Sequence, residues 1–214
     1  MMERIVLFGG GEHCRVVIDA LRSAGAPEPF GVIDLLDRVG GEVDGVKIIG
    51  TEADLQCLIM KGCTHALVTL GAARLGDDRA RVFGIAKAAG FGLAVVSHPS
   101  ATISGSAQLG EGTFVGPGAV VGTGARVGAN CIINSGAIVD HDCVLGDHVH
   151  IAPGVVMSGR VRVGERSLVG TGSSVIQGVS IGSRTIVGAG SAVVSDIGAG
   201  VVAFGVPCRE VSRA

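Results

Sequence analysis

A histidine flanked by two carboxylates stands at residues 140–142, in the segment VDHDCV. The imidazole of histidine has an unperturbed pKa of about 6.5, which suits a general base working at neutral pH. A neighbouring carboxylate orients such a ring and raises its basicity. His141 with Asp142 is therefore a candidate catalytic pair, although Asp and His are also ordinary residues of a solvated turn.

A glycine-rich segment near the start of the chain offers a second kind of chemistry. Residues 9–11 are all glycine and follow the short apolar run 4–8. Backbone N–H groups of such a turn, where it opens a helix, can approach a phosphate. The fingerprint GxGxxG is incomplete because Cys14 takes the place of its last glycine, which argues against a dinucleotide cofactor. Asp34 ends the next apolar run, where an acidic side chain can hold a ribose hydroxyl or simply close a strand.

The composition narrows the class of protein. The 214 residues carry a formal net charge of −2 and include neither Trp nor Tyr. A basic surface for nucleic acid or anionic membranes is therefore not expected, nor is base stacking on aromatic side chains. The six cysteines form no CxxC pair, and the apolar run at the N-terminus is too short for a signal sequence or a membrane span. We expect a cytoplasmic protein with reduced thiols and no metal.

The elements that must position these groups differ between the two halves of the chain. Apolar runs predict strands over 4–8, 30–33, 65–70 and 93–96, and helical spacing predicts helices over 15–24, 53–60 and 77–89. This alternation predicts a small parallel sheet covered by helices. Pro99 then marks a boundary, because proline cannot donate to a strand ladder.

The second half follows a strict period of six. An aliphatic residue occupies every sixth position from Ile103 to Val193, sixteen times without interruption. A fixed short period predicts a stacked solenoid. Residues two apart on a strand share a face, so the first and fifth positions of each hexad point inward and the third and fourth form an exposed corner. Three such sides predict a triangular coil of about 18 residues per turn, with about five turns.

This assignment sorts the candidate residues. His141 and Asp142 take the third and fourth positions, so both side chains fall on an exposed corner. Cys143 takes the fifth position and points into the core, which argues against a thiol nucleophile. Glycine is common at the second position, where we expect the chain to approach the bend.

The repeats resemble those of the hexapeptide-repeat acyltransferases, whose fold is a left-handed parallel β-helix. The segment NSGAIVDHDCVLGDHVHIAPGVVMSG, with Asn134, His141, Asp142 and His150, further resembles the sugar O- and N-acetyltransferases of the sialic-acid and bacillosamine type. The resemblance implies a Rossmann-like α/β domain over residues 1–98 that binds a nucleotide-linked sugar. It implies a β-helix acyltransferase domain over residues 99–214 that ends in a short C-terminal tail. It also implies a homotrimer and a place in O-antigen or lipopolysaccharide biosynthesis.

The same resemblance gives roles to individual residues. His141 is the implied general base, Asp142 increases its basicity, and His150 contacts the thioester end of acetyl-CoA. Small residues, which the coil also requires, match positions along the pantetheine arm: Gly159, Thr171 and Ala189. Contact positions for the nucleotide-linked sugar are matched by Gly11, Glu12, His13, Asp34, Leu35, Gly71 and Asn134.

The implied reaction is acetyl transfer from acetyl-CoA to the amino group of a nucleotide-linked 4-amino-4,6-dideoxy sugar, by direct attack in a ternary complex. The acceptor is GDP-perosamine or a UDP-linked analogue; Leu35 departs from the Asp-Asp pair of the bacillosamine enzymes, so the base stays open. O-acetylation of a sugar hydroxyl and a catalytically silent scaffold also stay open. Zinc is a further alternative, because γ-type carbonic anhydrases share the fold. However, His141, His148 and His150 lack that family's spacing, and His148 is expected in a solvated turn.

Overall fold

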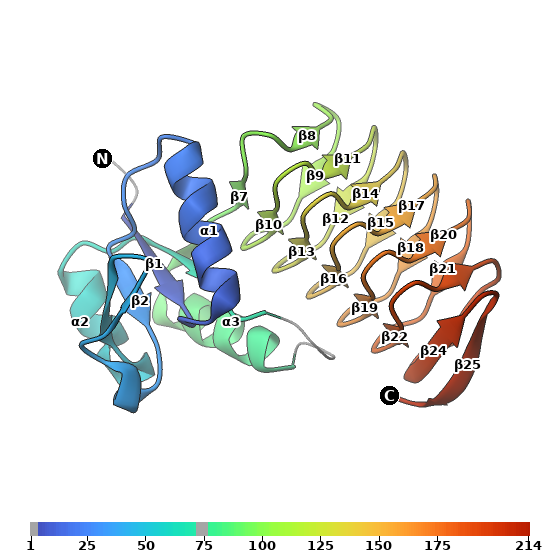
Figure 1. Ribbon diagram of the computed structural model, residues 1–214. Helices are drawn as coiled ribbons and strands as arrows, with labels where there is room; N and C mark the ends of the chain where they lie inside the picture. Colours follow the sequence, from blue (N-terminus) through green and yellow to red (C-terminus); the bar gives the residue numbers. More distant parts are fainter. Residues whose placement is uncertain (1–3, 72–76) are drawn as a thin grey trace.

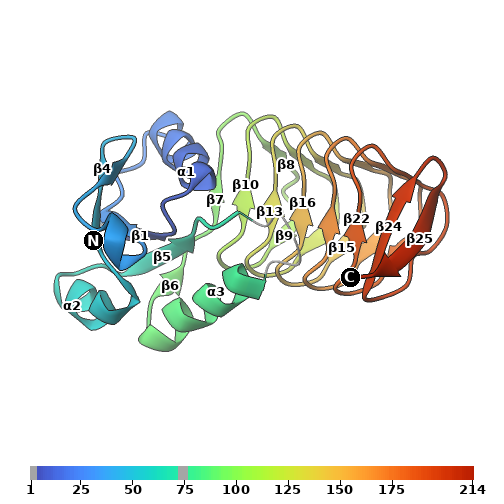
Figure 2. The same ribbon diagram turned by 60° about the horizontal axis from the view of Figure 1, so that its bottom comes forward.

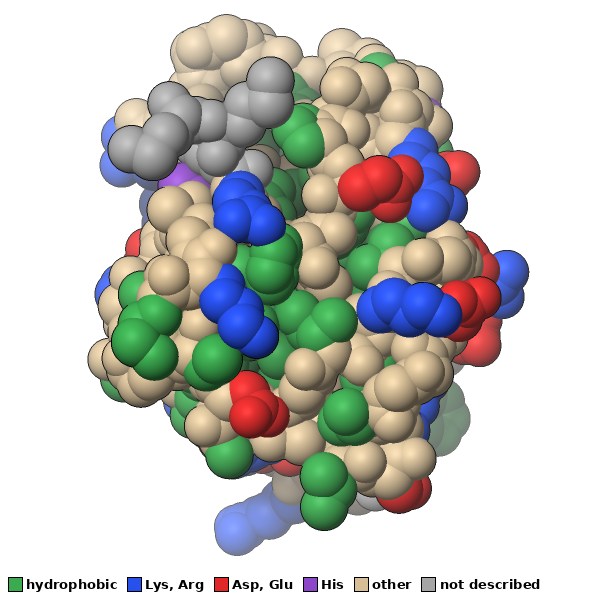
Figure 3. Space-filling view, turned by 90° about the vertical axis from the view of Figure 1, so that its left-hand side faces the viewer, with side chains coloured by type: hydrophobic (Ala, Val, Ile, Leu, Met, Phe, Trp, Pro, Cys, Tyr) green, Lys and Arg blue, Asp and Glu red, His purple; other side chains and the backbone are tan. Residues whose placement is uncertain are grey.

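The computed structural model of the chain describes residues 4–71 and 77–214. It has an α/β part at one end, a triangular coil of short strands, and a β-hairpin at the other end (Figures 1 and 2). The expected architecture, a Rossmann-like α/β domain followed by a left-handed parallel β-helix, is confirmed. On the face of the α/β end drawn in Figure 3, acidic and basic side chains are interspersed among apolar ones.

The α/β part is a six-stranded sheet with helices packed against it. Its strand order is β3-β4-β2-β1-β5-β6, and all neighbouring strands are parallel except the pair β3 and β4. The apolar side chains of residues 6–8 in β1 and 66–68 in β5 are buried because helices cover the sheet. The elements are β1 (Ile5–Phe8), α1 (Glu12–Ser23), β2 (Gly31–Ile33), η1 (Leu36–Arg38), β3 (Glu42–Val43), β4 (Val46–Gly50), η2 (Glu52–Asp54), α2 (Leu55–Met60), β5 (His65–Val68), α3 (Asp77–Ala89) and β6 (Gly92–Leu93).

The structure of this part differs from the sequence-based expectations in three places. The first helix starts at Glu12, three residues earlier than predicted, so the glycine-rich turn runs directly into it. The hairpin of β3 and β4 was not predicted; β3 has only two residues, which is too short to show an alternation of apolar residues. The predicted strand 93–96 is divided: β6 joins the α/β sheet, whereas β7 (Val96–Ser97) pairs with β10 (Phe114–Val115) of the coil.

The coil has three faces, each a parallel sheet. We call them face A (β7, β10, β13, β16, β19, β22 and β24), face B (β8, β11, β14, β17, β20 and β23) and face C (β9, β12, β15, β18 and β21). Paired residues along a face are 18 apart, for example Phe114 with Ile132 and Ile132 with His150. The coil strands are β8 (Thr102–Ile103), β9 (Gln108–Leu109), β11 (Val120–Val121), β12 (Arg126–Val127), β13 (Ile132–Ile133), β14 (Ile138–Val139), β15 (Val144–Leu145), β16 (His150–Ile151), β17 (Val156–Met157), β18 (Arg162–Val163), β19 (Leu168–Val169), β20 (Ser174–Val175), β21 (Ser180–Ile181), β22 (Ile186–Val187) and β23 (Ala192–Val193).

The hexad positions predicted as corners are turns, and the fifth position is buried as expected, Cys143 included. The explanation given for the second-position glycines is wrong. Their backbone φ is ordinary, and glycine is required because successive coils touch there: a Cβ at Gly110 would lie 2.4 Å from the carbonyl carbon of Gly128. The left-handed backbone that favours glycine occurs at the fourth position instead, as at Gly136 with φ 64°.

The end of the chain is more ordered than a tail. Strand β24 (Val201–Gly205) continues face A in parallel with β22, and β25 (Cys208–Arg213) folds back antiparallel to it. An exposed parallel edge would offer free N–H and C=O groups to another chain. The antiparallel return strand covers that edge of face A.

Candidate active site

His141 and Asp142 lie at the corner between faces B and C, in the turn from β14 to β15. The Nδ1 atom of His141 lies 3.0 Å from Oδ2 of Asp142, and the two side chains are 44% and 61% exposed. The backbone N–H of His141 donates to Oδ1 of Asp140 at 2.6 Å, which fixes the turn. Because Asp142 holds Nδ1, Nε2 is the ring atom left to exchange a proton with a substrate.

Gly159 lies one coil beyond His141, with the imidazole against it. A Cβ at Gly159 would lie 2.2 Å from Nε2 and 2.4 Å from Cε1 of His141. No side chain fits between the ring and the backbone at that distance. Gly159 is buried, and the lack of a side chain there leaves room for the edge of the imidazole. The spacing of 18 residues, which is one turn of the coil, also places Gly159 beside His141.

Asn134 and His150 form a second group, which lies on face A. Asn134 follows β13, His150 begins β16, and the side-chain nitrogen of Asn134 lies 3.2 Å from Nε2 of His150. The Oδ1 atom of Asn134 accepts the backbone N–H of Ser135 at 2.8 Å, so its amide nitrogen faces the ring. The amide nitrogen can only donate, so Nε2 of His150 is the acceptor of this hydrogen bond.

Within one chain these two groups stand apart. His141 and Gly159 occupy the corner between faces B and C, whereas Asn134 lies at the corner between faces A and B. Thr171 and Ala189, 18 residues apart, are exposed at the same A–B corner. Among the predicted acetyl-CoA positions, Gly159 thus lies at one corner of face B and Thr171 and Ala189 at the other, whereas His150 lies in β16 of face A.

The glycine-rich turn and Asp34 meet at the carboxyl ends of β1 and β2. The carboxylate of Asp34 is only 10% exposed and accepts the N–H of Gly10 at 2.9 Å and that of Leu35 at 2.8 Å. Arg38 joins the same cluster: its guanidinium donates to Oδ2 of Asp34 at 2.5 Å and to the carbonyl of Gly10 at 2.9 Å. Sequence reasoning missed Arg38, although its place four residues after Asp34 in a helical turn was a usable signal.

The other predicted sugar-binding positions surround this turn. Gly11, Glu12 and Leu35 are exposed, and so is Gly71 after β5. A Cβ at Gly71 would lie 3.9 Å from Cβ of His13, so the ends of β1 and β5 are neighbours. The arrangement is that of an open parallel α/β sheet, which binds ligands at the carboxyl ends of its strands.

His13 connects this turn to the coil. Its ring packs edge-on against Phe114 of β10, with the ring centroids 5.1 Å apart. Burial, with Arg79 and His150 nearby, lowers the pKa of His13 to about 3. The imidazole is therefore neutral at physiological pH and packs as an apolar ring between the two parts of the protein.

This neutral ring predicts a loss of stability in acid. The unfolded chain binds a proton at His13 below about pH 6.5, whereas the folded chain does so only near pH 3, so stability is lost as the pH falls between these values. From pH 7 to pH 5, His13 lowers the free energy of unfolding by about 2 kcal/mol. Urea unfolding of the protein and of His13→Gln at both pH values measures the difference. An equal loss in both proteins would contradict the prediction.

The packing of His148 contradicts one further expectation. His148 is not in a solvated turn: its ring is half-buried, lies edge-on to Phe83 of α3 at 5.5 Å, and is hydrogen-bonded to Asn130. Among residues 4–71 and 77–214, no three side chains of His, Cys, Asp or Glu are grouped so that they could hold a metal ion. No helix in these same ranges is both long and apolar enough to cross a membrane.

A parallel β-helix with a histidine–carboxylate pair at a corner, preceded by an α/β domain, defines an acyltransferase of the hexapeptide-repeat class. Family models agree: residues 4–82 match the PglD N-terminal domain, residues 124–159 the bacterial transferase hexapeptide, and residues 160–195 the hexapeptide repeat of succinyl-transferase. No curated protein matches the chain.

Solved structures give the family. Perosamine N-acetyltransferase from Caulobacter crescentus, an H141N variant in complex with CoA and GDP-perosamine, is 38% identical with a TM-score of 0.92, over 99% of this chain and 98% of that chain. The acetyltransferase domain of PglB from Neisseria gonorrhoeae, in complex with acetyl coenzyme A, is 36% identical with a TM-score of 0.90, over 99% and 100%. WeeI from Acinetobacter baumannii is 25% identical with a TM-score of 0.86, over 98% and 100%. The chain belongs to the hexapeptide-repeat N-acetyltransferases that carry a PglD-type N-terminal domain.

Proposed function

We propose that the protein transfers the acetyl group of acetyl-CoA to the 4-amino group of a nucleotide-linked 4-amino-4,6-dideoxy sugar, with GDP-perosamine as the first candidate. The observation that carries the proposal is the paired His141 and Asp142, with Gly159 against the ring edge. The similarity over the whole chain to an enzyme solved with CoA and GDP-perosamine supports both substrates.

In the proposed reaction the neutral amine attacks the thioester carbonyl directly. The new bond is C–N, the C–S bond breaks, and coenzyme A leaves as a thiolate. Nε2 of His141 takes the proton that the amine loses and passes it to the leaving sulfur, while Asp142 stabilises the imidazolium through Nδ1. No thiol nucleophile is required, and burial raises the pKa of the Cys143 thiol at this corner.

We further propose a homotrimer built on face B. Its outward side chains include Val156, Ile176 and Val194, which are 42%, 47% and 44% exposed. A threefold arrangement around face B would set the A–B corner of one chain, with Asn134 and Thr171, against the B–C corner of the next. The two groups that are separate within one chain would then line one acetyl-CoA site.

The assembly is tested by placing a charge on face B. We expect Val156→Glu to yield monomers in light scattering and to lose most activity, because a buried unpaired carboxylate is costly at an apolar interface. Val144→Glu is the matched control, since Val144 holds the equivalent outward position in β15 of face C. A trimer in Val156→Glu, or a monomer in the unchanged protein, would contradict the proposal.

The acceptor is identified by thiol release from acetyl-CoA with GDP- and UDP-linked 4-amino-4,6-dideoxyhexoses. We expect turnover with a GDP-linked amine and less with the UDP-linked one. Turnover with neither amine would contradict N-acetylation. Turnover with a sugar hydroxyl would then assign O-acetylation to the same residues, and absence of acetyl-CoA binding would indicate a silent scaffold.

A further inference from the structure

The corner between faces C and A differs from the corner between faces A and B. At the fourth hexad position it carries, over four successive coils, residues other than glycine in the left-handed region: Asn130, His148, Arg166 and Arg184, with φ of 54°, 60°, 56° and 53°. The A–B corner has glycine at all five equivalent positions, namely Gly118, Gly136, Gly154, Gly172 and Gly190. The left-handed conformation is strained for residues that have a Cβ atom. Its presence at these four positions indicates that their side chains are needed.

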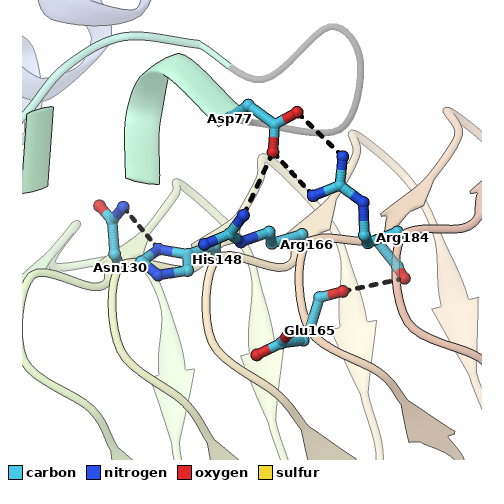
Figure 4. Close-up of polar contacts among 7 residues, drawn as sticks. Asp77, Asn130, His148, Glu165, Arg166 and Arg184 are labelled. Atoms are coloured by element: carbon cyan, nitrogen blue, oxygen red, sulfur yellow. Dashed lines mark hydrogen bonds and ion pairs between the residues drawn. The ribbon is translucent and has the colours of Figure 1, made fainter. Parts of the chain in front are cut away.

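All four side chains lie on the side of the coil that faces helix α3 (Figure 4). Asp77, the first residue of α3, accepts two hydrogen bonds from Arg184 at 3.0 and 3.1 Å and a longer one from Arg166 at 3.5 Å. One coil closer to the α/β end, the ring of His148 lies edge-on to Phe83. The corner therefore holds α3 along its length.

Arg79 is the buried member of this contact. Its side chain is 1% exposed. Within residues 4–71 and 77–214 its hydrogen-bond partners are carbonyls: Val68 at 2.5 Å and Leu70 at 2.9 Å through Nη1, and Asn130 at 3.1 Å through Nε. The amide of Asn130 donates back to the carbonyl of Arg79 at 3.3 Å. The two residues thus join the α/β part and the coil by reciprocal hydrogen bonds.

Contacts connect Arg79 and Asn130 to the glycine-rich turn. Val68 and Leu70 flank Thr69, whose hydroxyl donates to the carbonyl of Gly9 at 2.6 Å. Leu70 also packs on Gly9, where a Cβ would lie 2.4 Å from its Cδ2 atom. A shift of Arg79 would therefore move the end of β5 and the glycine-rich turn together.

We propose that Arg79 is a positioning residue that, with Asn130, fixes the glycine-rich turn and the end of β5 relative to the β-helix. It sets the place from which a nucleotide-linked sugar reaches the corner that binds the acetyl donor. The inference deepens the proposed function and rests on it for the identity of the substrate. Arginine is needed because its planar guanidinium donates hydrogen bonds to carbonyls in three directions. A lysine ammonium cannot reach all three carbonyls at once.

The test compares Arg79→Lys and Asn130→Gly with Arg81→Lys, a control two residues along α3 whose side chain pairs with Glu52 inside the α/β part. We expect Arg79→Lys to raise KM for GDP-perosamine about tenfold or more and to leave KM for acetyl-CoA within about twofold. Asn130→Gly keeps the left-handed backbone and the carbonyl to which Arg79 donates, so it should raise KM for GDP-perosamine by a smaller factor. Arg81→Lys should move neither.

Hydrogen exchange gives a readout independent of activity. In Arg79→Lys we expect faster exchange at two amides: that of Gly9, which donates to the carbonyl of Ile33, and that of Thr69, which donates to the carbonyl of Phe8. Exchange in face B of the coil should be unchanged. Equal rises in both KM values, or unchanged exchange at Gly9 and Thr69, would overturn the positioning role. If Arg79→Lys does not fold, Asn130→Gly decides by the same two measurements. Failure of the unchanged protein to acetylate any amino sugar would instead contradict the proposed function, and the exchange result would stand alone.

Discussion

His141→Asn is expected to lower kcat about 10²–10⁴-fold, because the variant removes the group that accepts the amine proton. Asparagine is close in size to part of the imidazole and uncharged, so the turn and both substrate positions should persist. Turnover is measured by thiol release at saturating concentrations of both substrates, and binding of CoA by titration calorimetry. Near-normal turnover with intact binding would contradict the assignment of the base.

Asp142→Asn is the natural companion variant. Asp142 has φ of 56°, a conformation that asparagine tolerates well, so the corner should keep its shape. The amide no longer stabilises an imidazolium, and we expect a fall in kcat smaller than that of His141→Asn, about tenfold. A loss as large as that of His141→Asn would indicate that Asp142 acts on the substrate itself.

Gly159→Ala is expected to lower kcat/KM by about 10²-fold or more while the coil stays folded, because a misplaced catalytic group costs rate without loss of the fold. The new methyl group would lie 2.2 Å from Nε2 of His141, so either the imidazole or the backbone must move. An exposed imidazole moves more easily than a buried coil, so the ring is expected to leave its position against Asp142. Steady-state kinetics and thermal unfolding measure the two effects.

Gly105→Ala is the matched control for this variant. Gly105 occupies the same third hexad position at the same B–C corner, three coils nearer the start, and nothing lies within 4 Å of a Cβ placed there. We expect normal kinetics and an almost unchanged Tm. If Gly159→Ala were as active as Gly105→Ala, the packing of the ring against Gly159 would have no part in catalysis.

The fold of the second half was predictable because the hexad repeat leaves little freedom. An aliphatic residue at every sixth position fixes which side chains point inward, so the burial of Cys143 and the exposure of His141 follow from counting. The first half was predictable in type but not in detail. The hairpin of β3 and β4 and the division of residues 93–96 depend on which strand each segment pairs with, and pairing is a long-range choice.

For the candidate site, sequence patterns identified the residues themselves but not the residues that they contact. The sequence left open whether Asp34 holds a ribose hydroxyl or closes a strand, and in the structure its carboxylate accepts hydrogen bonds from Gly10 and Arg38. His148 was expected in solvent but packs against Phe83. In both cases the partner comes from a helical segment whose placement no local pattern specifies.

The sequence by itself determined the β-helix, the inward and outward side chains of the coil, and the pair His141 and Asp142 at an exposed corner. These follow from local spacing, because a strand turns its side chains to alternate sides whatever surrounds it. The tertiary structure alone decided which corner α3 docks on, and so placed Arg79 against Asn130. It also decided where α1 meets the coil, and so placed His13 against Phe114. The hexad pattern assigns a residue to a corner in the same way whether its side chain faces solvent or a helix. Only the packing of the α/β part against the coil decides between these two environments.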